Sequence, residues 1–344
     1  MKIAIVLFNL GGPDSLDAVR PFLINLFSDP EIIRVPSFIR ALLARFIVFR
    51  RAPIAREIYA KIGGGSPIVP ETKLQARALE AAMGEKGIEA KCFIAMRYWR
   101  PFTAEAAAAV KAFAPDKVVL LPLYPQYSTT TTRSSRGAWA KDTKNLKLDF
   151  PTCEICCYPT EAGFIAAVVA RMREVMAQMK PGVEYRVLFS AHGLPKKIVE
   201  AGDPYQSQVE MTAAAIVQKF GNENLDWTVC YQSRVGPLEW IGPATDDEIR
   251  RAGNDGKGVI VVPVAFVSEH SETLVELDMD YAELARHVGV PDYLRAATVR
   301  DHPDFIAGLA ALVSVGLNAK KPVSCHPSRT CPLGTSCGQD GARA

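Results

Sequence analysis

Short apolar runs rich in valine, isoleucine and leucine alternate along this chain with segments of helical periodicity. The alternation is typical of parallel sheets covered by helices on both faces, because the strands of such sheets are buried on both sides. We predict strands at Lys2–Phe8, Lys91–Met96, Lys117–Leu123, Glu184–Phe189, Trp227–Tyr231 and Gly258–Phe266. We predict helices between them at Glu71–Met83, Thr103–Phe113, Phe164–Met179, Gln206–Phe220, Asp246–Gly253 and Glu272–His287. The sequence therefore indicates an α/β fold.

The two halves of the chain resemble each other weakly. IAIVLFNLGGP near the N-terminus resembles YRVLFSAHGLP from Tyr185, and VVLLPLYPQYS from Val118 resembles VIVVPVAFVSE in the second half. A length of 344 residues also suits two domains. We therefore expect two tandem doubly wound, Rossmann-like parallel-sheet domains, 1–145 and 146–318, followed by a cysteine-containing tail, 319–344.

The composition excludes several classes of protein. Lysine and arginine number 40 against 37 acidic residues, and a net charge of +3 is too small for a broad nucleic-acid-binding face. No apolar run reaches the roughly 18 residues of a membrane span. MKIAIVLFNLGGP is not followed by a small-residue cleavage site, so it predicts a buried strand rather than a signal peptide. We therefore expect a cytoplasmic protein without a nucleic-acid partner.

Unusual side chains follow several of the predicted strands. In open α/β sheets, ligands bind beyond the carboxyl ends of the strands, so we expect these segments to converge on one cleft. The segments are Asn9–Pro13, Arg97–Trp99, Tyr124–Thr132, Ser190–Pro195, Gln232–Pro237 and Ser268–Glu272. The aromatic and cationic residues among them suit a flat, conjugated ligand with carboxylates, although each is also common in ordinary packing.

His192 and a run of acids are the strongest candidates for chemistry. His192 ends a predicted strand, where an imidazole can accept a proton, bind a metal or simply stabilise a turn. Acids recur every three or four residues and predict one stripe along a helix: Glu269, Glu272, Glu276, Asp280 and Glu283. Such a stripe is either a solvated face with arginine partners or a track of oxygen ligands for a hard divalent cation. We expect Glu272 to lie deepest, poorly solvated, with a raised pKa.

Two further segments do not fit a plain doubly wound domain. Residues 35–53 predict a basic amphipathic helix with a broad apolar face, which suits a membrane surface, the entrance for an apolar ligand or a core-facing helix. The tail carries Cys325, Cys331 and Cys337, a spacing of neither common zinc modules nor ferredoxins. These are either free thiols or ligands of a metal centre that needs one more thiolate. The candidates for that thiolate are Cys153, Cys156 and Cys157.

Many of these segments together resemble the ferrochelatase family, which inserts ferrous iron into a porphyrin to make haem. The family's order is kept by an LNLGGP-type start, RRAP, YAKIGGGSPI, RYWRP, LYPQYS, LFSAHGLP, GDPY, YQSRVGP, WIGP and SEHSETLVELD, so the resemblance extends to about residue 318. It implies a chelatase-like fold and a lyase-class enzyme. The implied reaction inserts Fe²⁺ into protoporphyrin IX, releases two protons and forms protohaem.

The resemblance also implies roles for single residues. It makes His192 the active-site histidine and Glu272 its carboxylate partner across the porphyrin, with Glu269 and Glu276 as further metal ligands. His270 and Asp278 fall in the family's acidic helix. The substrate-binding residues that it implies are Leu10, Arg50, Arg51, Tyr59, Arg97, Tyr98, Ser128 and Trp240. Leu10 stands where other members place methionine or tyrosine near the metal.

The resemblance further implies cofactors and partners. Some members carry a 2Fe–2S cluster on C-terminal cysteines, which makes Cys325, Cys331 and Cys337 three of its ligands, and we choose Cys157 as the fourth. The helix within 35–53 corresponds to the lip by which members touch the membrane, and cluster-bearing members are commonly homodimers. The alternatives are a coproporphyrin ferrochelatase, a cobalt or sirohydrochlorin-type chelatase, and a non-catalytic haem or iron carrier.

Overall fold

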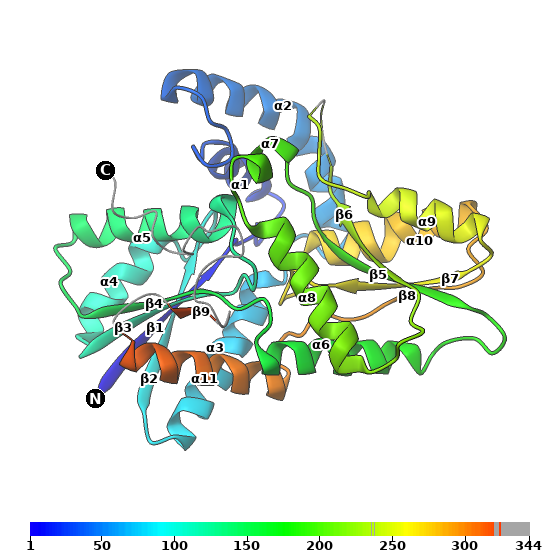
Figure 1. Cartoon of the computed structure of the whole chain (residues 1–344). Coiled ribbons are helices and arrows are strands. Elements are labelled where there is room, and N and C mark those ends of the chain that lie inside the picture. The colour runs from blue at the N-terminus through cyan, green and yellow to red at the C-terminus, as the bar shows by residue number, and fades with distance from the viewer. Residues whose placement is uncertain (235, 237, 320–322, 325–344) are drawn as a thin grey trace. The chain divides into compact units, whose positions relative to one another are not determined.

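The chain forms two units, each built around its own parallel sheet (Figure 1). The computed structural model describes residues 1–234, 236, 238–319 and 323–324. The first unit consists of Met1–Cys156 with Ala310–Val323, and the second contains Cys157–Leu309. No helix among the described residues has the length and apolar character needed to cross a membrane.

The sheet of the first unit has the strand order β2-β1-β3-β4-β9. Its strands are β1 (Lys2–Asn9), β2 (Glu89–Met96), β3 (Lys117–Pro122), β4 (Thr152–Cys157) and β9 (Val323–Ser324). The pairings of β1 with β2 and β3, and of β3 with β4, are parallel. β1 lies between β2 and β3 and Ile3–Leu7 have no exposed surface, which explains why the strand is apolar from Ile3 to Phe8.

Helices cover both faces of this first sheet (Figure 1). The helices of this unit are α1 (Val19–Phe27), α2 (Ser37–Lys61), α3 (Ile68–Glu85), α4 (Thr103–Phe113), the π-helix η1 (Thr129–Arg133), α5 (Ser134–Asn145) and the second half of α11 (Pro303–Asn318), of which α1 and α2 pack against each other. α4 and α5 lie on one face, where Trp139 packs edge-on against Phe8 at 6.2 Å between ring centroids. α3 lies on the other face and packs against β2.

The sheet of the second unit has the order β6-β5-β7-β8, with parallel pairing throughout. Its strands are β5 (Tyr185–His192), β6 (Trp227–Gln232), β7 (Gly258–Pro263) and β8 (Tyr293–Arg295). Its helices are α6 (Ala162–Met176), α7 (Lys196–Glu200), α8 (Tyr205–Phe220), α9 (Thr245–Asn254), the π-helix η2 (Glu272–Asp280), α10 (Tyr281–His287) and the first half of α11. α9 and α10 lie on one face of the sheet, and α6 and α8 lie on the other (Figure 1).

The predicted two-part, doubly wound fold is confirmed. β1 corresponds to β5 and β3 to β7 in matching strand orders, as the sequence repeats predict. The segment predicted as one helix, Glu272–His287, is a π-helix followed by an α-helix. The short strands β4, β8 and β9 were not predicted.

The expected domain boundary differs from the observed pairing. It assigned residues 146–156 to the second domain, but Val118 of β3 pairs with Thr152 of β4, so this segment completes the first sheet. TCEICC has neither a continuous aliphatic run nor clear alternation, and its cysteines pointed instead to metal binding.

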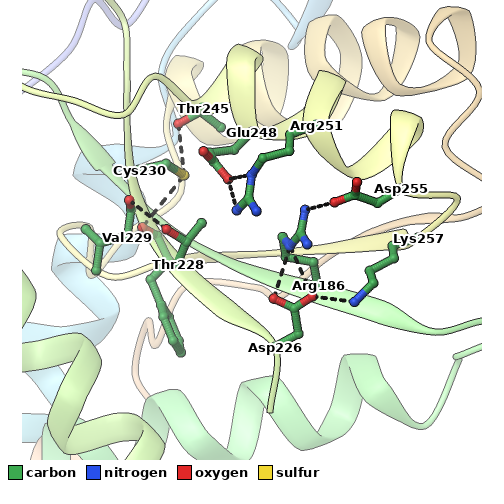
Figure 2. A network of polar contacts seen from close by, with 11 residues as sticks. Arg186, Asp226, Thr228, Val229, Cys230, Thr245, Glu248, Arg251, Asp255 and Lys257 are labelled. Carbon is green, nitrogen blue, oxygen red and sulfur yellow. Dashed lines mark hydrogen bonds and ion pairs between the residues drawn. The ribbon is translucent and has the colours of Figure 1, made fainter. Parts of the chain in front are cut away.

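A polar network joins the amino-terminal ends of the strands in the second unit (Figure 2). The buried Arg186 of β5 donates from Nε to both carboxylate oxygens of Asp226 at 3.1 Å and from Nη1 to Asp255 at 2.9 Å. Lys257 donates to Asp226 at 2.7 Å. Burial alone would raise the pKa of Asp226, but Arg186 and Lys257 hold it below its ordinary value. This end of the sheet is therefore held by paired charges.

Candidate active site

His192 is the last residue of β5, at the carboxyl end of the strand. Its Nδ1 is 2.8 Å from Oε2 of Glu272, the first residue of η2 in the segment after β7. β5 and β7 are neighbouring strands, and strands in a sheet lie about 4.8 Å apart, so residues beyond their ends can touch. We expected the two side chains on opposite flanks of a porphyrin, whereas the structure places them in direct contact.

The contact between His192 and Glu272 sets the pKa values of both groups. The surrounding protein alone would lower the pKa of His192, but the charge of Glu272 and the hydrogen bond to it raise that pKa above its ordinary value. Burial alone would raise the pKa of Glu272, but the neighbouring His192 lowers it. The expectation of a raised pKa at Glu272 is therefore wrong, because it considered loss of solvent and not the imidazole. The raised pKa belongs to Glu276, which is half-buried and close to the charge of Glu272.

The end of β6 holds both carboxylates in place. The Ser233 hydroxyl lies within hydrogen-bond distance of both Glu272 Oε2, at 3.1 Å, and Glu276 Oε2, and its one hydrogen can be donated to either; its backbone N–H donates to Glu276 Oε1 at 2.8 Å. Ser233 has φ of +61°, a left-handed conformation that is uncommon for residues other than glycine and that clusters at functional sites. Ser190 donates to Gln232 at 2.7 Å, and Gln232 donates to Glu272 at 3.5 Å. The sequence signals for Gln232 and Ser233 were their position after a predicted strand and their place in the YQSRVGP motif, and neither assigned them a role.

The predicted single acidic stripe is divided into separate groups. A π-helix bonds residue i to i+5 and has more residues per turn than an α-helix, so an α-helical stripe does not form in η2. Glu272 and Glu276 meet at Ser233. Glu269 and Asp278 instead bind Arg295, and Asp280 and Glu283 are exposed. The interpretation as solvated or arginine-paired acids therefore holds for these four, and the role of Glu272 and Glu276 as metal ligands stays a prediction.

Glu269 differs from the other expected metal ligands in its surroundings. Both of its carboxylate oxygens accept from Arg295 Nη1, at 2.9 and 3.1 Å, and one also accepts from Thr298 N–H at 2.9 Å. Burial alone would raise the pKa of Glu269, but Arg295 lowers it. Within the part of the chain that the structure describes, no three His, Cys, Asp or Glu side chains are placed to hold a metal ion together.

A small polar pocket lies beside Glu276. It has a volume of about 200 Å³ and is lined by Tyr231, Ser233, Arg234, Asp246, Glu276 and Tyr281. The Tyr281 hydroxyl donates to Glu276 Oε1 at 3.1 Å, which fixes this carboxylate at the pocket wall. A second histidine, the buried His270, also lies near Glu272. Its Nε2 is 3.9 Å from Glu272 Oε1, and burial lowers the pKa of the His270 imidazole.

Trp240 lies in the second unit next to the turn that follows His192. A Cβ added to Gly193 would come within 3.2 Å of the Trp240 ring, so the indole packs directly on this turn. The indole is half-buried. Trp240 thus packs against the residue that follows His192 in the chain, and its predicted role in substrate binding stays a prediction.

Arg97 and Tyr98 follow β2 in the first unit and share one buried acid. Asp29 accepts from Arg97 Nη2 at 2.8 Å, from the Tyr98 hydroxyl at 2.7 Å and from Ser134. Tyr98 has no exposed surface and packs with Tyr59 between α1 and α2, in a cluster that Leu10 also contacts. The structure therefore shows Tyr98 as a packing residue that shares Asp29 with Arg97, and Tyr59 as a member of the same apolar cluster. The predicted substrate contacts of both stay predictions.

Ser128 is also buried in the first unit. It caps η1, where its hydroxyl accepts from Thr130 N–H at 3.2 Å and lies 2.9 Å from the Thr130 hydroxyl. The structure gives Ser128 this local role in ending the loop after β3. Its predicted contact with substrate stays a prediction.

The apolar face of α2 is exposed to solvent. Phe38, Leu42, Phe46 and Phe49 are 62–70% exposed, and Arg50 and Arg51 are exposed on the same helix. The opposite side of α2 buries Ala44, Val48, Ala52 and Tyr59. The interpretation of a core-facing helix is therefore wrong for the large apolar side chains.

The expected cluster ligands are only partly within the structure. Cys325, Cys331 and Cys337 lie outside the described residues. Cys157 ends β4, is buried and accepts from Gln208 Nε2 at 3.6 Å. Cys153 and Cys156 are also buried in β4, so burial alone does not separate the three candidates. β9, which ends at Ser324, lies next to β4 in the sheet.

Comparison with known proteins gives a consistent result. A family model described as Ferrochelatase matches residues 2–317. The ferrochelatase of Caulobacter vibrioides (strain NA1000 / CB15N) is 59% identical over 319 residues, covering 92% of this chain and 91% of that protein. The ferrochelatase of Phenylobacterium zucineum (strain HLK1) is 54% identical over 312 residues, covering 90% of each chain.

A solved structure shares the fold at low sequence identity. The sirohydrochlorin chelatase SirB from Bacillus subtilis subspecies spizizenii, in complex with cobalt, has a TM-score of 0.55 and 11% identity, covering 93% of this chain and 97% of that one. This likeness supports the chelatase-like fold. The family match spans both units and contains His192, Glu272 and Glu276, so the motif resemblance is confirmed over the length at which it was expected. The chain belongs to the ferrochelatase family.

Proposed function

We propose that this lyase-class metal chelatase inserts Fe²⁺ into protoporphyrin IX, with the hydrogen-bonded pair of His192 and Glu272 as its proton-accepting group. The observation that carries this proposal is the 2.8 Å contact between Nδ1 and Oε2 at the carboxyl end of β5, in a member of the ferrochelatase family. The alternatives with coproporphyrin or another tetrapyrrole differ in substrate and not in this pair.

The chemistry needs a base because a free-base porphyrin carries two N–H protons. When Nδ1–H of His192 donates to Glu272, the lone pair of the imidazole is on Nε2, which is the nitrogen that can accept a proton. The carboxylate holds this tautomer and stabilises the imidazolium that forms. Bending of the ring by the walls of the site would expose the nitrogen lone pairs, and such strain typically amounts to about 1–5 kcal/mol.

Ferrous iron, as a substrate, needs ligands that bind it only transiently and then release it to the porphyrin. Glu272 and Glu276 supply carboxylates next to His192, and Glu276 also lines the polar pocket. We therefore assign the passage of iron to His192, Glu272 and Glu276. Glu269 is left out of this set because Arg295 already neutralises its charge.

Porphyrin recognition is assigned to residues of each unit separately. In the first unit we propose Arg97, held by Asp29, as the principal substrate contact, with Leu10, Tyr59, Tyr98 and Ser128 around it. The exposed Arg50 and Arg51 suit the propionate carboxylates. In the second unit, Trp240 beside the turn after His192 supplies an aromatic face.

The exposed face of α2 also supports binding to a membrane surface. Large apolar side chains next to exposed arginines are typical of helices that lie in the interface of an anionic bilayer. Protoporphyrin IX carries vinyl groups and is the more apolar of the two porphyrin candidates, so delivery from a membrane favours it over coproporphyrin III. We therefore propose peripheral binding through α2.

A 2Fe–2S cluster on the tail is part of the proposal. Four thiolates are a usual donor set for this cluster, and Cys325, Cys331 and Cys337 with Cys157 would supply them. The support is topological: β9 ends at Ser324 directly before Cys325 and lies next to β4, which ends at Cys157. The homodimer expected from the resemblance stays a prediction.

Removal of the base tests the central proposal. We expect the wild type to convert protoporphyrin IX and Fe²⁺ to haem over many turnovers, and His192→Ala to lower kcat about 100-fold or more, since a general base typically contributes 10²–10⁴. Porphyrin binding, followed by fluorescence quenching, should persist. His192→Gln can still hydrogen-bond Glu272 and should be as inactive, whereas His287→Ala removes an exposed histidine and serves as control. Near-normal turnover in both His192 variants, or single-turnover binding by the wild type, would refute the proposal.

Glu272→Gln tests the carboxylate through the pH profile. Because Glu272 raises the pKa of His192, its neutralisation should lower that pKa, so the acid limb of kcat against pH should move to lower pH. We expect kcat at neutral pH to fall about 10-fold or more, as for other partners of a reactive histidine, with porphyrin affinity little changed. An unmoved acid limb, or loss of porphyrin binding alone, would show that Glu272 is misassigned.

Vesicle binding tests the role of α2. The triple variant Phe38→Ser, Leu42→Ser and Phe46→Ser should weaken sedimentation with phosphatidylglycerol vesicles at least about 10-fold, because each fully buried large side chain contributes about 1.5–3 kcal/mol. The control triple Leu74→Ser, Met179→Ser and Val315→Ser removes exposed apolar side chains outside α2. Equal losses in both triples, or no binding by the wild type, would contradict a membrane role for α2.

Spectroscopy of single cysteine variants tests the cluster. Anaerobically purified protein should be brown, with absorbance beyond about 400 nm from thiolate-bound iron. Cys325→Ser and Cys157→Ser should lose this absorbance together with bound iron and sulfide, and the buried neighbour Cys153→Ser should keep it. A colourless wild type would count against the cluster, and loss in Cys153→Ser but not in Cys157→Ser would reassign the fourth ligand.

A further inference from the structure

The short strand β8 contacts the π-helix η2 through two side chains. Tyr293 and Arg295 are two residues apart and therefore point to the same face of the strand. The Tyr293 hydroxyl donates to the backbone carbonyl of Leu277 at 2.6 Å. Arg295 forms a two-pronged pair with Asp278, from Nε to Oδ1 and from Nη2 to Oδ2, both at 2.6 Å. β8 thus holds the second half of η2.

Arg295 also binds the residues that precede η2. Its Nη1 donates to both oxygens of Glu269, at 2.9 and 3.1 Å, so a single guanidinium links an acid before Glu272 with an acid after it. The side chains of Arg295 and Glu269 are only 11% and 10% exposed. A planar guanidinium can satisfy two carboxylates at once, whereas the ammonium of lysine is a point donor without this fork.

This clamp matters because the helix that it holds is irregular. π-helical turns are rare and occur mostly as single turns at functional sites. A shift of one residue along a regular helix rotates a side chain by about 100° about the axis, since a turn has 3.6 residues. A small change of register between Glu269 and Asp278 would therefore turn Glu272 away from His192 and Glu276 away from Ser233.

We infer that Arg295 is a positioning residue for metal insertion: it acts through Glu269 and Asp278 to hold η2 in the register that pairs Glu272 with His192. The inference rests on the proposed role of the His192–Glu272 pair. Other charged or titratable groups around the pair are Glu276 and His270 on the same segment and Tyr205 of α8. None of these provides a link between the two ends of η2.

Arg186 provides a matched control in the same sheet. It is a buried arginine that binds two acids, Asp226 and Asp255, and its side chain is 6% exposed (Figure 2). It lies six residues before His192 in β5, roughly 20 Å away at about 3.3 Å per residue. Arg186→Lys should therefore cost stability without moving the site.

The experiment compares Arg295→Lys, Asp278→Asn and Arg186→Lys in steady-state insertion of Fe²⁺ and Zn²⁺, below the unfolding temperature of each variant. We expect Arg295→Lys to lower kcat about 10- to 100-fold, the usual effect of losing a residue that orients a catalytic group, with KM for porphyrin unchanged. Asp278→Asn keeps the ion pair between Arg295 and Glu269 and should show a smaller loss of kcat. If Arg295→Lys does not fold, Asp278→Asn still tests the inference. Arg186→Lys should lower Tm and leave kcat unchanged.

A double variant separates positioning from general stability. Because Arg295 acts through Glu272, Arg295→Lys combined with Glu272→Gln should be no slower than Glu272→Gln alone. Wild-type kcat in both Arg295→Lys and Asp278→Asn, or fully multiplicative losses in the double variant, would overturn the inference while Glu272→Gln remained impaired. Wild-type kcat in Glu272→Gln itself would instead refute the proposed role of the pair.

Discussion

The contact between His192 and Glu272 is the interaction on which the rest of this site depends. Taking a carboxylate out of water is costly unless a charge and hydrogen bonds compensate, and Glu272 obtains them from His192, Ser233 and Gln232. The same contact raises the pKa of His192, so one pair explains both the stability of a half-buried acid and the basicity of the imidazole. It also accounts for the strained backbone at Ser233, whose hydroxyl reaches Glu272 and Glu276 together.

The two units place different chemistry on the same topological frame. β1 and β5 occupy matching positions in their sheets, and they end on Asn9 and His192. β2 and β6 also match, and the residues that follow them are Arg97 and Ser233. A π-helix begins after β3 in one unit and after β7 in the other. The repeated topology thus supplies strand ends, and the side chains at those ends decide whether a unit presents a cation or an imidazole and acids there.

The sequence predicted what depends on local pattern. Buried strands were found because both faces are apolar, and His192 could be associated with Glu272 because each follows a strand in one repeated pattern. The register of η2 could not be predicted, since the acidic spacing was interpreted with the period of an α-helix. Arg295 was missed because its partners lie 17 and 26 residues away along the chain, and β8, only three residues long, has too few positions to show a period.

The ion pairs of Arg295 explain how this segment tolerates so many acids close together. Five carboxylates at close spacing would repel one another if all were ionised and equivalent. Arg295 neutralises Glu269 and Asp278, and its fork directs both to structure rather than to a cation. The negative charge beside His192 is therefore concentrated on Glu272 and Glu276, of which Glu276 has the raised pKa and takes up a proton more readily.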